Sequence, residues 1–505
     1  MSLRRILKLL GAFFMSQGVA VLNQLLVPPI FLHRYPHGVE MYGEWIALTA
    51  AVSYLASLNA GIQTYGNSQM TLHYNRGEVQ EAKIVQSSMM RILLILLLLA
   101  AGFGTALLFM PLVRWMGLRH ITSTAAALTL FLMILRLVTG WIFAFNCGSH
   151  MMIGEYHRGV VWRNVQRLVA MLALAVFLWM RASFPILALT QLASMVLCTA
   201  ALIIDVRFRT PILVPSLRYG TRKDMFAVLK PTAYYMLYQL GGFLCWEGPI
   251  LLIQKILGPT AVAVYAVTRV VFNMSRQAII VFTNALSQQN IELIARRSWK
   301  QLQRMYDLSE RVVLLLDPTA TVGVLLACPL LFSVWLHKRG LYHPGVCIMM
   351  AVISAVMALR HHKWSFQYLS NRHEGVAKVC VAAYGVMIVF TALTLGAWGI
   401  HAYLAAWLAA ELVICAYVIR QNRLLFPAEF RPPLAPLARL AVLLAVAFGL
   451  AAWPVLHDAT WPLHRVAAVA AFATMALLVV DYFAFGLQEL QAVFQRRLKR
   501  RFSFR

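Results

Sequence analysis

The sequence predicts an all-α polytopic membrane protein with about fourteen transmembrane helices. Three observations predict this fold class. Hydrophobic residues make up 61% of the 505 residues and charged residues only 12%, whereas a soluble domain carries about a quarter charged residues. Apolar segments of about 20 residues, the length that crosses a bilayer, recur along the whole chain. Most Lys and Arg lie in short connections that would face one side of the membrane.

The predicted helices fall into two groups of six and a final pair. The first group is Ile6–Leu32, Met41–Ile62, Val85–Phe109, Ile121–Cys147, Val160–Trp179 and Phe184–Val206. The second group is Pro231–Ile256, Val262–Gln288, Val312–Trp335, Val346–Leu369, Val376–Trp398 and Tyr403–Ile419. The final pair is Leu437–Leu456 and Val466–Phe485, after a proline-rich connector. The first segment is too long for a cleaved signal peptide, so we expect it to be a spanning helix.

The charged connections predict the orientation. An even number of spans places both termini on one side, and both ends of the chain are basic, so both termini are predicted to be cytoplasmic. The long basic connections 207–230 and 296–304 fit the same side, and the short turns poor in cations fit the outside. We see no segment for a folded soluble domain or a large external loop, which argues against enzymes that work through such a domain.

The net charge of +27 is explained by this membrane pattern. The cations lie beside apolar segments, so anionic membrane lipids are the expected partner and nucleic acid is not. The seven cysteines are scattered without a CxxC spacing. They are expected to be packing residues without a metal or redox role.

A weak internal repeat predicts two halves. Pro36 precedes Tyr42 by six residues after the first helix, and Pro259 precedes Tyr265 in the same way after the seventh. The predicted domains are an N-terminal six-helix lobe at 1–210, a cytoplasmic linker at 211–230, a C-terminal six-helix lobe at 231–426, and the extra pair with a basic cytoplasmic tail at 427–505. Parallel repeats of this kind predict a binding site between the lobes. Within the linker region, Tyr219–Leu229 is predicted to be a short amphipathic surface helix.

Polar residues within the apolar segments are the candidates for function, because a charge in a bilayer is costly unless it is used. In Val262–Gln288, much of the polar set shares one helical face; the set is Arg269, Asn273, Arg276, Gln277, Asn284 and Gln288. This stripe is either a cavity wall that offers donors to an anionic substrate or a packing surface between helices. We favour the cavity, since two arginines exceed what packing requires.

Three further cations lie inside apolar segments. Arg136 stands alone in the fourth helix, and Arg360 and Lys363 accompany two histidines in the tenth. Arginine suits phosphate because its planar fork donates two parallel hydrogen bonds. Arg136 would therefore either form a substrate-binding cationic cluster with Arg269, or snorkel to the interface or pair with an acid. Arg360 and Lys363 form either a substrate site or an interfacial collar.

Buried acids and amides complete the candidate set. Glu247 and Asp317 would bind H⁺ or Na⁺ and couple transport to an ion gradient, or they would neutralise a cation such as Arg269. Glu411 and Asp481 are placed nearer helix ends or in peripheral helices. The amides of Gln17, Asn23, Gln24, Asn59 and Gln63 would bond sugar hydroxyls or neighbouring helices. Walker A, GxSxG and HExxH motifs are absent from the sequence, so ATP hydrolysis and hydrolytic catalysis are not indicated.

Two segments carry a family resemblance. The stretch from Ile253 to Arg269, with its Leu-Gly turn, apolar pair, Tyr and Arg, resembles the connection of helices seven and eight in the multidrug/oligosaccharidyl-lipid/polysaccharide (MOP) superfamily. Met41–Trp45 is the matching feature of the first half. Within that superfamily the chain resembles the Wzx-type polysaccharide flippases more than the drug antiporters.

The resemblance implies a transporter that is not an enzyme. It would export an undecaprenyl-diphosphate-linked oligosaccharide across the bacterial inner membrane for O-antigen, capsule or exopolysaccharide synthesis. Two lobes would rock around a cationic cavity, driven by H⁺ or Na⁺ without another cofactor, and other polysaccharide assembly proteins would be partners.

Two alternatives stay open. The first is a multidrug antiporter, for which we would expect an acidic cavity that binds organic cations. The first helix lacks the acid that proton-coupled bacterial antiporters carry, although Glu247 resembles an acidic position in their seventh helix. The second is a polysaccharide polymerase or ligase, which usually needs a sizeable external loop.

Overall fold

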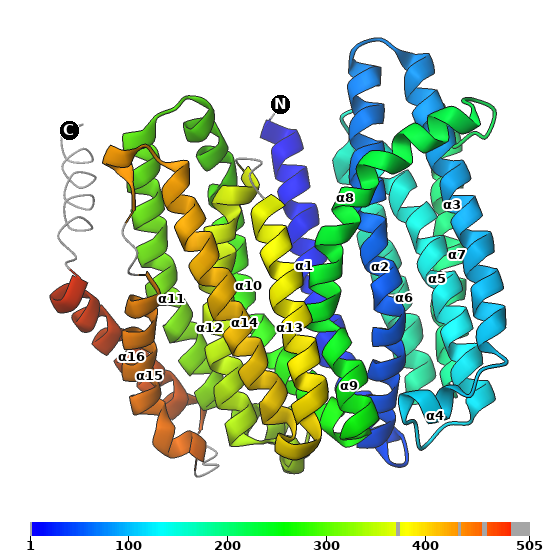
Figure 1. The fold of residues 1–505 in the computed structure, drawn as a ribbon. Coiled ribbons are helices and arrows are strands. Elements are labelled where there is room, and N and C mark those ends of the chain that lie inside the picture. Colours follow the sequence, from blue (N-terminus) through cyan, green and yellow to red (C-terminus); the bar gives the residue numbers. More distant parts are fainter. Residues whose placement is uncertain (1–2, 370–373, 433–435, 457–461, 486–505) are drawn as a thin grey trace. The chain divides into compact units, whose positions relative to one another are not determined.

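The described part of the chain is entirely helical apart from its connections. The computed structural model describes residues 3–369, 374–432, 436–456 and 462–485. Within those residues it contains sixteen α-helices and three short 3₁₀ turns, and no strand (Figure 1). Packing divides the chain into two compact units, residues 1–263 and 264–505.

The first unit is a bundle arranged around α5. Its helices are α1 (Leu3–Arg34), α2 (Gly38–Asn75), α3 (Val79–Leu107), α4 (Leu112–Met116), α5 (Ser123–Ser149), α6 (Tyr156–Trp179), α7 (Phe184–Arg209), α8 (Arg222–Trp246) and α9 (Gly248–Ile256). Helix α5 packs against α2, α3, α6 and α7. An aromatic cluster joins α1, α2 and α7, in which the Trp45 and Phe184 ring centroids are 5.4 Å apart in an edge-on arrangement. Helix α1 also packs directly against α6, and the candidate site lies beside these two helices.

The second unit is organised around α11 and α12. Its helices are α10 (Pro259–Ala295, which begins in the first unit), α11 (Trp299–Val334), α12 (Pro344–Leu369), α13 (Glu374–Trp398), α14 (Ile400–Leu425), α15 (Pro436–Leu456) and α16 (Leu463–Phe485). Helix α14 packs against α12 and α13, and α11 packs against α12, α15 and α16. The predicted final helix pair is therefore present as α15 and α16.

Every predicted apolar segment overlaps an observed helix. The seventh segment is divided into α8 and α9 at Glu247, next to Gly248 and Pro249, because a proline has no N–H to continue the helical hydrogen bonds. Among the described residues, eight helices are long and apolar enough to cross a membrane, and two shorter apolar helices accompany them. The chain is thus a multi-pass membrane protein. The count of fourteen spans, the orientation and the lobe boundaries stay predictions, and the basic residues after 485 lie outside the described part.

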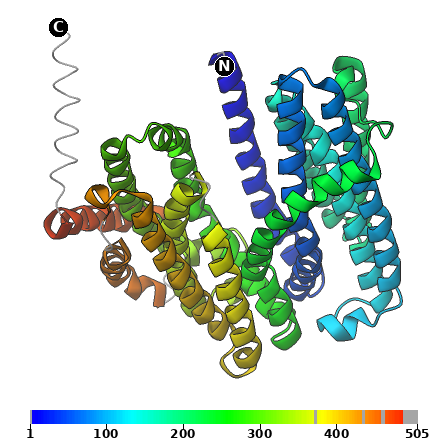
Figure 2. The ribbon, with the colours of Figure 1, turned by 45° about the horizontal axis from the view of Figure 1, so that its top comes forward.

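The predicted surface helix at Tyr219–Leu229 is wrong. A capping box formed by Thr221 and Asp224 starts α8, which then runs without interruption to Trp246. The cap satisfies the first free N–H groups of the helix and so fixes where it begins. Helix α8 crosses α2 and α3 obliquely (Figure 2).

Side chains of α3 hold the connection that precedes α8. The Gln86 amide donates to the Leu213 carbonyl at 2.8 Å, and the Arg91 guanidinium donates to the Gly220 carbonyl at 2.8 Å. These bonds satisfy backbone carbonyls that a loop would otherwise leave to water. The linker is therefore fastened to the first unit along its length.

Candidate functional site

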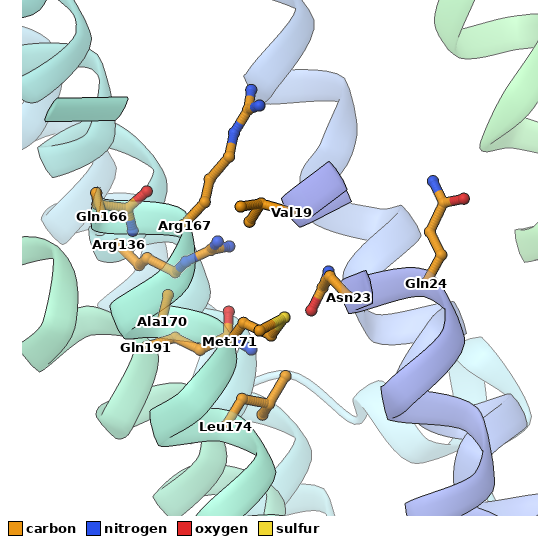
Figure 3. Close-up of a pocket in the computed structure, with 10 residues that line it drawn as sticks. All are labelled: Val19, Asn23, Gln24, Arg136, Gln166, Arg167, Ala170, Met171, Leu174 and Gln191. Atoms are coloured by element: carbon orange, nitrogen blue, oxygen red, sulfur yellow. The ribbon is translucent and has the colours of Figure 1, made fainter. Parts of the chain in front are cut away.

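A cavity of about 240 Å³ lies inside the first unit, between α1, α5, α6 and α7 (Figure 3). Its lining residues are Val19, Asn23 and Gln24 of α1, Arg136 of α5, Gln166, Arg167, Ala170, Met171 and Leu174 of α6, and Gln191 of α7. The polar members are two arginines and four amides. Neither Asp nor Glu occurs among these described lining residues, so the cavity is positively charged.

Two buried donors of the cavity lack a protein partner. Arg136 Nε and Gln166 Nε2 are both buried, and neither has a hydrogen-bond acceptor within the described residues. A buried donor without an acceptor costs about 1–3 kcal/mol, and more when the group is charged. Both donors therefore favour occupation of the cavity by a molecule that supplies acceptor oxygens. The Arg136 guanidinium points into the cavity, toward Val19 and Asn23 of α1 (Figure 3).

Arg167 is exposed and stands at one side of the cavity. Its guanidinium donates to the Ser16 hydroxyl of α1 at 2.7 Å, which joins α6 to α1. Arg167 and Gln166 were not among the residues predicted from the sequence. The signal was the helical spacing that puts Gln166, Ala170 and Leu174 on adjoining turns of α6.

The predicted amides divide into two groups. Asn23 and Gln24 line the cavity, whereas the Gln63 amide donates to the Trp141 carbonyl at 3.2 Å and so contributes to helix packing. The side chains of Gln17 and Asn59 lie outside the described part of the structure. The same holds for Asn284 and Gln288 of α10.

The cations of α10 contact polar and aromatic neighbours. Arg276 donates to Asn273 Oδ1 at 2.6 Å, and its other terminal nitrogen is 3.0 Å from the Met357 sulfur of α12. The Arg269 guanidinium lies 5.5 Å from the ring centroid of Tyr265. Arg276 and Asn273 thus present one connected polar group, and Arg269 lies about one helical turn from Asn273 and about two from Arg276.

The cations of α12 are paired with buried acids. Arg360 Nε is 2.7 Å from Glu411 Oε2, and Lys363 forms an ion pair with Glu310 of α11. Lys363 is fully buried, and its ammonium lies 3.8 Å from the Tyr306 ring centroid. The placement of Glu411 in a peripheral position is wrong: it is fully buried and also accepts hydrogen bonds from Tyr384 and Trp407.

The two coupling candidates lie in different surroundings. Asp317 is 2% exposed, and its Oδ1 accepts a long bond of 3.4 Å from the Thr321 hydroxyl. Asp317 Oδ2 has no hydrogen-bond partner within the described residues. Glu247 is half-buried at the break between α8 and α9. Asp317 is therefore a buried carboxyl that a proton or a cation would stabilise.

Comparison with known proteins places the fold. No protein-family model matches the chain, and no curated protein matches it. Among solved structures, the lipid II flippase MurJ in an inward closed conformation is similar, with a TM-score of 0.70, 10% identity, and coverage of 94% of this chain and 99% of that one.

Two further structures have the same architecture. An inward-facing MATE-family multidrug resistance transporter of the MOP superfamily has a TM-score of 0.63, 13% identity, and coverage of 81% of this chain and 94% of that one. A MOP-superfamily transporter from Pyrococcus furiosus, described as having a binding pocket of reversed polarity, has a TM-score of 0.53, 13% identity, and coverage of 83% and 95%. The chain therefore has the MOP transporter fold, and at these identities the likeness extends to the fold alone.

Proposed function

We propose that this protein is a flippase that moves a polyprenyl-diphosphate-linked oligosaccharide across the bacterial inner membrane for O-antigen, capsule or exopolysaccharide synthesis. The observation that carries the proposal is the cavity of the first unit, where Arg136 and Arg167 stand among four amides without an acid among its described lining residues. Guanidinium groups attract an anionic cargo, and amides bond the hydroxyls of sugars. The fold, which a lipid II flippase shares, supports the same class of cargo.

The second unit would take part through α10 and α11. Arg276, Asn273 and Arg269 offer further donors to an anionic cargo, and the unpartnered oxygen of Asp317 suits a coupling proton or Na⁺. In this proposal the two units alternate access to the cargo, with Glu247 as a second coupling candidate. Arg360 and Lys363 would contribute only if the cargo displaced their acid partners, because each ion pair already neutralises its cation.

A multidrug antiporter is the second candidate, because a MATE transporter has the same fold. An organic cation would need a carboxylate in its cavity, and the described lining residues supply arginines instead. A polysaccharide polymerase or ligase is a weaker candidate. Sugar transfer by the purified protein would favour it.

The experiment replaces Arg136 in a strain that lacks the chromosomal gene. Arg136→Ala is expected to abolish surface polysaccharide while immunoblotting shows normal levels of the protein in the membrane. Arg163→Ala is the matched control, since Arg163 donates to the Tyr156 hydroxyl at 2.9 Å and does not line the cavity. Unchanged polysaccharide in the Arg136→Ala strain would contradict the flippase proposal. Altered drug resistance without a polysaccharide defect would favour the antiporter.

A further inference from the structure

The cavity of the first unit is small for an oligosaccharide. At about 240 Å³ it lies below the range of about 300–1,000 Å³ that is usual for pockets of drug-sized ligands. It therefore suits one compact group of the cargo. The proposed cargo offers two groups with negative charge, the diphosphate and any acidic sugar.

We propose that this cavity is a subsite for one carboxylate-bearing sugar ring and does not hold the diphosphate. The inference rests on the proposed function and specifies which part of the cargo the first unit recognises. It predicts that the exported glycan contains an acidic sugar. Three features of the cavity support it.

The first feature is the amount of positive charge. Arg136 is the one arginine within the buried part of the lining, because Arg167 is exposed and bonded to Ser16 at 2.7 Å. A single guanidinium matches a single carboxylate, to which it donates two parallel hydrogen bonds. A diphosphate concentrates about two negative charges in one group, and it is commonly held by several converging cations or a metal ion.

The second feature is the set of amides. Gln166 and Gln191 are each less than a tenth exposed, and Asn23 and Gln24 complete the set. Each amide both donates and accepts hydrogen bonds. Sugar hydroxyls also donate and accept, so they satisfy both ends of an amide. Diphosphate oxygens accept only, so they would satisfy the unpartnered Gln166 Nε2 but could not donate to any of the amide carbonyls.

The third feature is the apolar part of the wall. Val19, Ala170, Met171 and Leu174 contribute aliphatic surface beside the polar groups. A sugar ring has a C–H face that loses water favourably against such a surface. A diphosphate has no apolar face and would lose hydration there without compensation.

The test measures binding to the purified full-length protein in detergent by isothermal titration calorimetry. The probes are glucuronate, glucose and inorganic pyrophosphate at one ionic strength. We expect glucuronate to bind at least about tenfold more tightly than either other probe. Arg136→Gln is expected to remove this preference and leave glucose binding unchanged, whereas Arg163→Gln should bind all three as the native protein does.

Three results would overturn the inference. They are pyrophosphate binding that is tighter than glucuronate binding and depends on Arg136, equal binding of glucuronate and glucose, and no binding of glucuronate. Gln191→Leu provides a second measurement if Arg136→Gln does not elute as a single species in gel filtration. It is expected to weaken glucuronate binding, because it removes an amide of the cavity, and unaltered binding would count against the subsite.

The binding test is independent of transport. If glucuronate binds through Arg136 and the Arg136→Ala strain still makes normal surface polysaccharide, the flippase proposal fails and the subsite stands. If polysaccharide is lost and pyrophosphate is the preferred probe, the flippase proposal stands and the assignment to an acidic sugar fails.

Discussion

Arg360 of α12 and Glu411 of α14 form an ion pair inside the second unit, with 2.7 Å between Nε and Oε2. The Glu411 carboxylate is fully buried and accepts two further hydrogen bonds, from the Tyr384 hydroxyl at 2.7 Å and the Trp407 indole at 3.1 Å. Three side chains, one each from α12, α13 and α14, therefore meet at the Glu411 carboxylate. The pair neutralises a cation whose charge, viewed in the sequence alone, suggested substrate binding.

This pair predicts a particular pattern of stability. Arg360→Met alone leaves Glu411 charged and buried, so it is expected to destabilise the protein by about 3–5 kcal/mol. Arg360→Met combined with Glu411→Leu removes both charges and is expected to restore much of that loss. Thermal unfolding of the detergent-purified variants measures the difference. The single variant Glu411→Leu completes the comparison. If the loss of stability in the double variant equals the sum of the losses in Arg360→Met and Glu411→Leu, the two charges do not stabilise each other.

Lys363 predicts a comparable effect one helical turn away. Its ammonium is fully buried, paired with Glu310 and stacked on Tyr306, and its backbone carbonyl accepts a bond from Asn422 at 2.9 Å. Lys363→Met should lower the membrane level of the protein, because Glu310 then keeps a buried charge without its partner. Lys378→Met on α13 is the control, since Lys378 is exposed. Immunoblotting of membranes measures both, and equal levels of the two variants would contradict the role of the pair.

Gly43 of α2 predicts a steric effect at the start of α10. A Cβ atom at Gly43 would lie 2.0 Å from the Pro259 carbonyl oxygen, so two backbone segments meet there without room for a side chain. These are the two segments that carry the family resemblance, Met41–Trp45 and Ile253–Arg269. Gly43→Ala is therefore expected to cost about 1–3 kcal/mol, as overpacking does.

Gly102 of α3 is the matched control for Gly43, because nothing lies within 4 Å of a Cβ built there. Gly102→Ala should leave stability unchanged or raise it slightly, since alanine favours a helix over glycine by about 1 kcal/mol. The midpoint of thermal unfolding distinguishes the two variants. If the Gly43→Ala protein is as stable as the Gly102→Ala protein, the backbone at Pro259 moves at little cost to make room for the added methyl group.

The helices were predictable from the sequence because bilayer length and apolar composition determine them locally. Arg136, Asn23 and Gln24 were also predictable as polar residues in apolar segments, and the structure brings them to one cavity. The acids that pair with Arg360 and Lys363 were not, since Glu411 and Glu310 lie on other helices and only tertiary packing selects them. Helix α4 was missed because five residues are too few to show a periodic pattern.

The surroundings of Asp317 are those expected of a residue that couples proton or Na⁺ binding to transport. Its carboxyl is 2% exposed, one oxygen has no hydrogen-bond partner within the described residues, and the other has only the 3.4 Å bond from Thr321. An ionised carboxylate in this position is compensated only by that long hydrogen bond and by the nearby charge of Arg276, so a bound proton or cation would stabilise it further. Asp317→Asn keeps the shape of the protonated acid and removes its ability to release the proton.

We therefore expect Asp317→Asn to reach the membrane at native levels and to lower surface polysaccharide at least about tenfold, which corresponds to about 1.4 kcal/mol in the transport step. Glu374→Gln is the control, because Glu374 is exposed in the first turn of α13. If Asp317 had only a structural role, Asp317→Asn would leave both the membrane level of the protein and the export of polysaccharide unchanged. Normal export by Asp317→Asn would exclude Asp317 from coupling and leave Glu247, at the break between α8 and α9, as the remaining candidate.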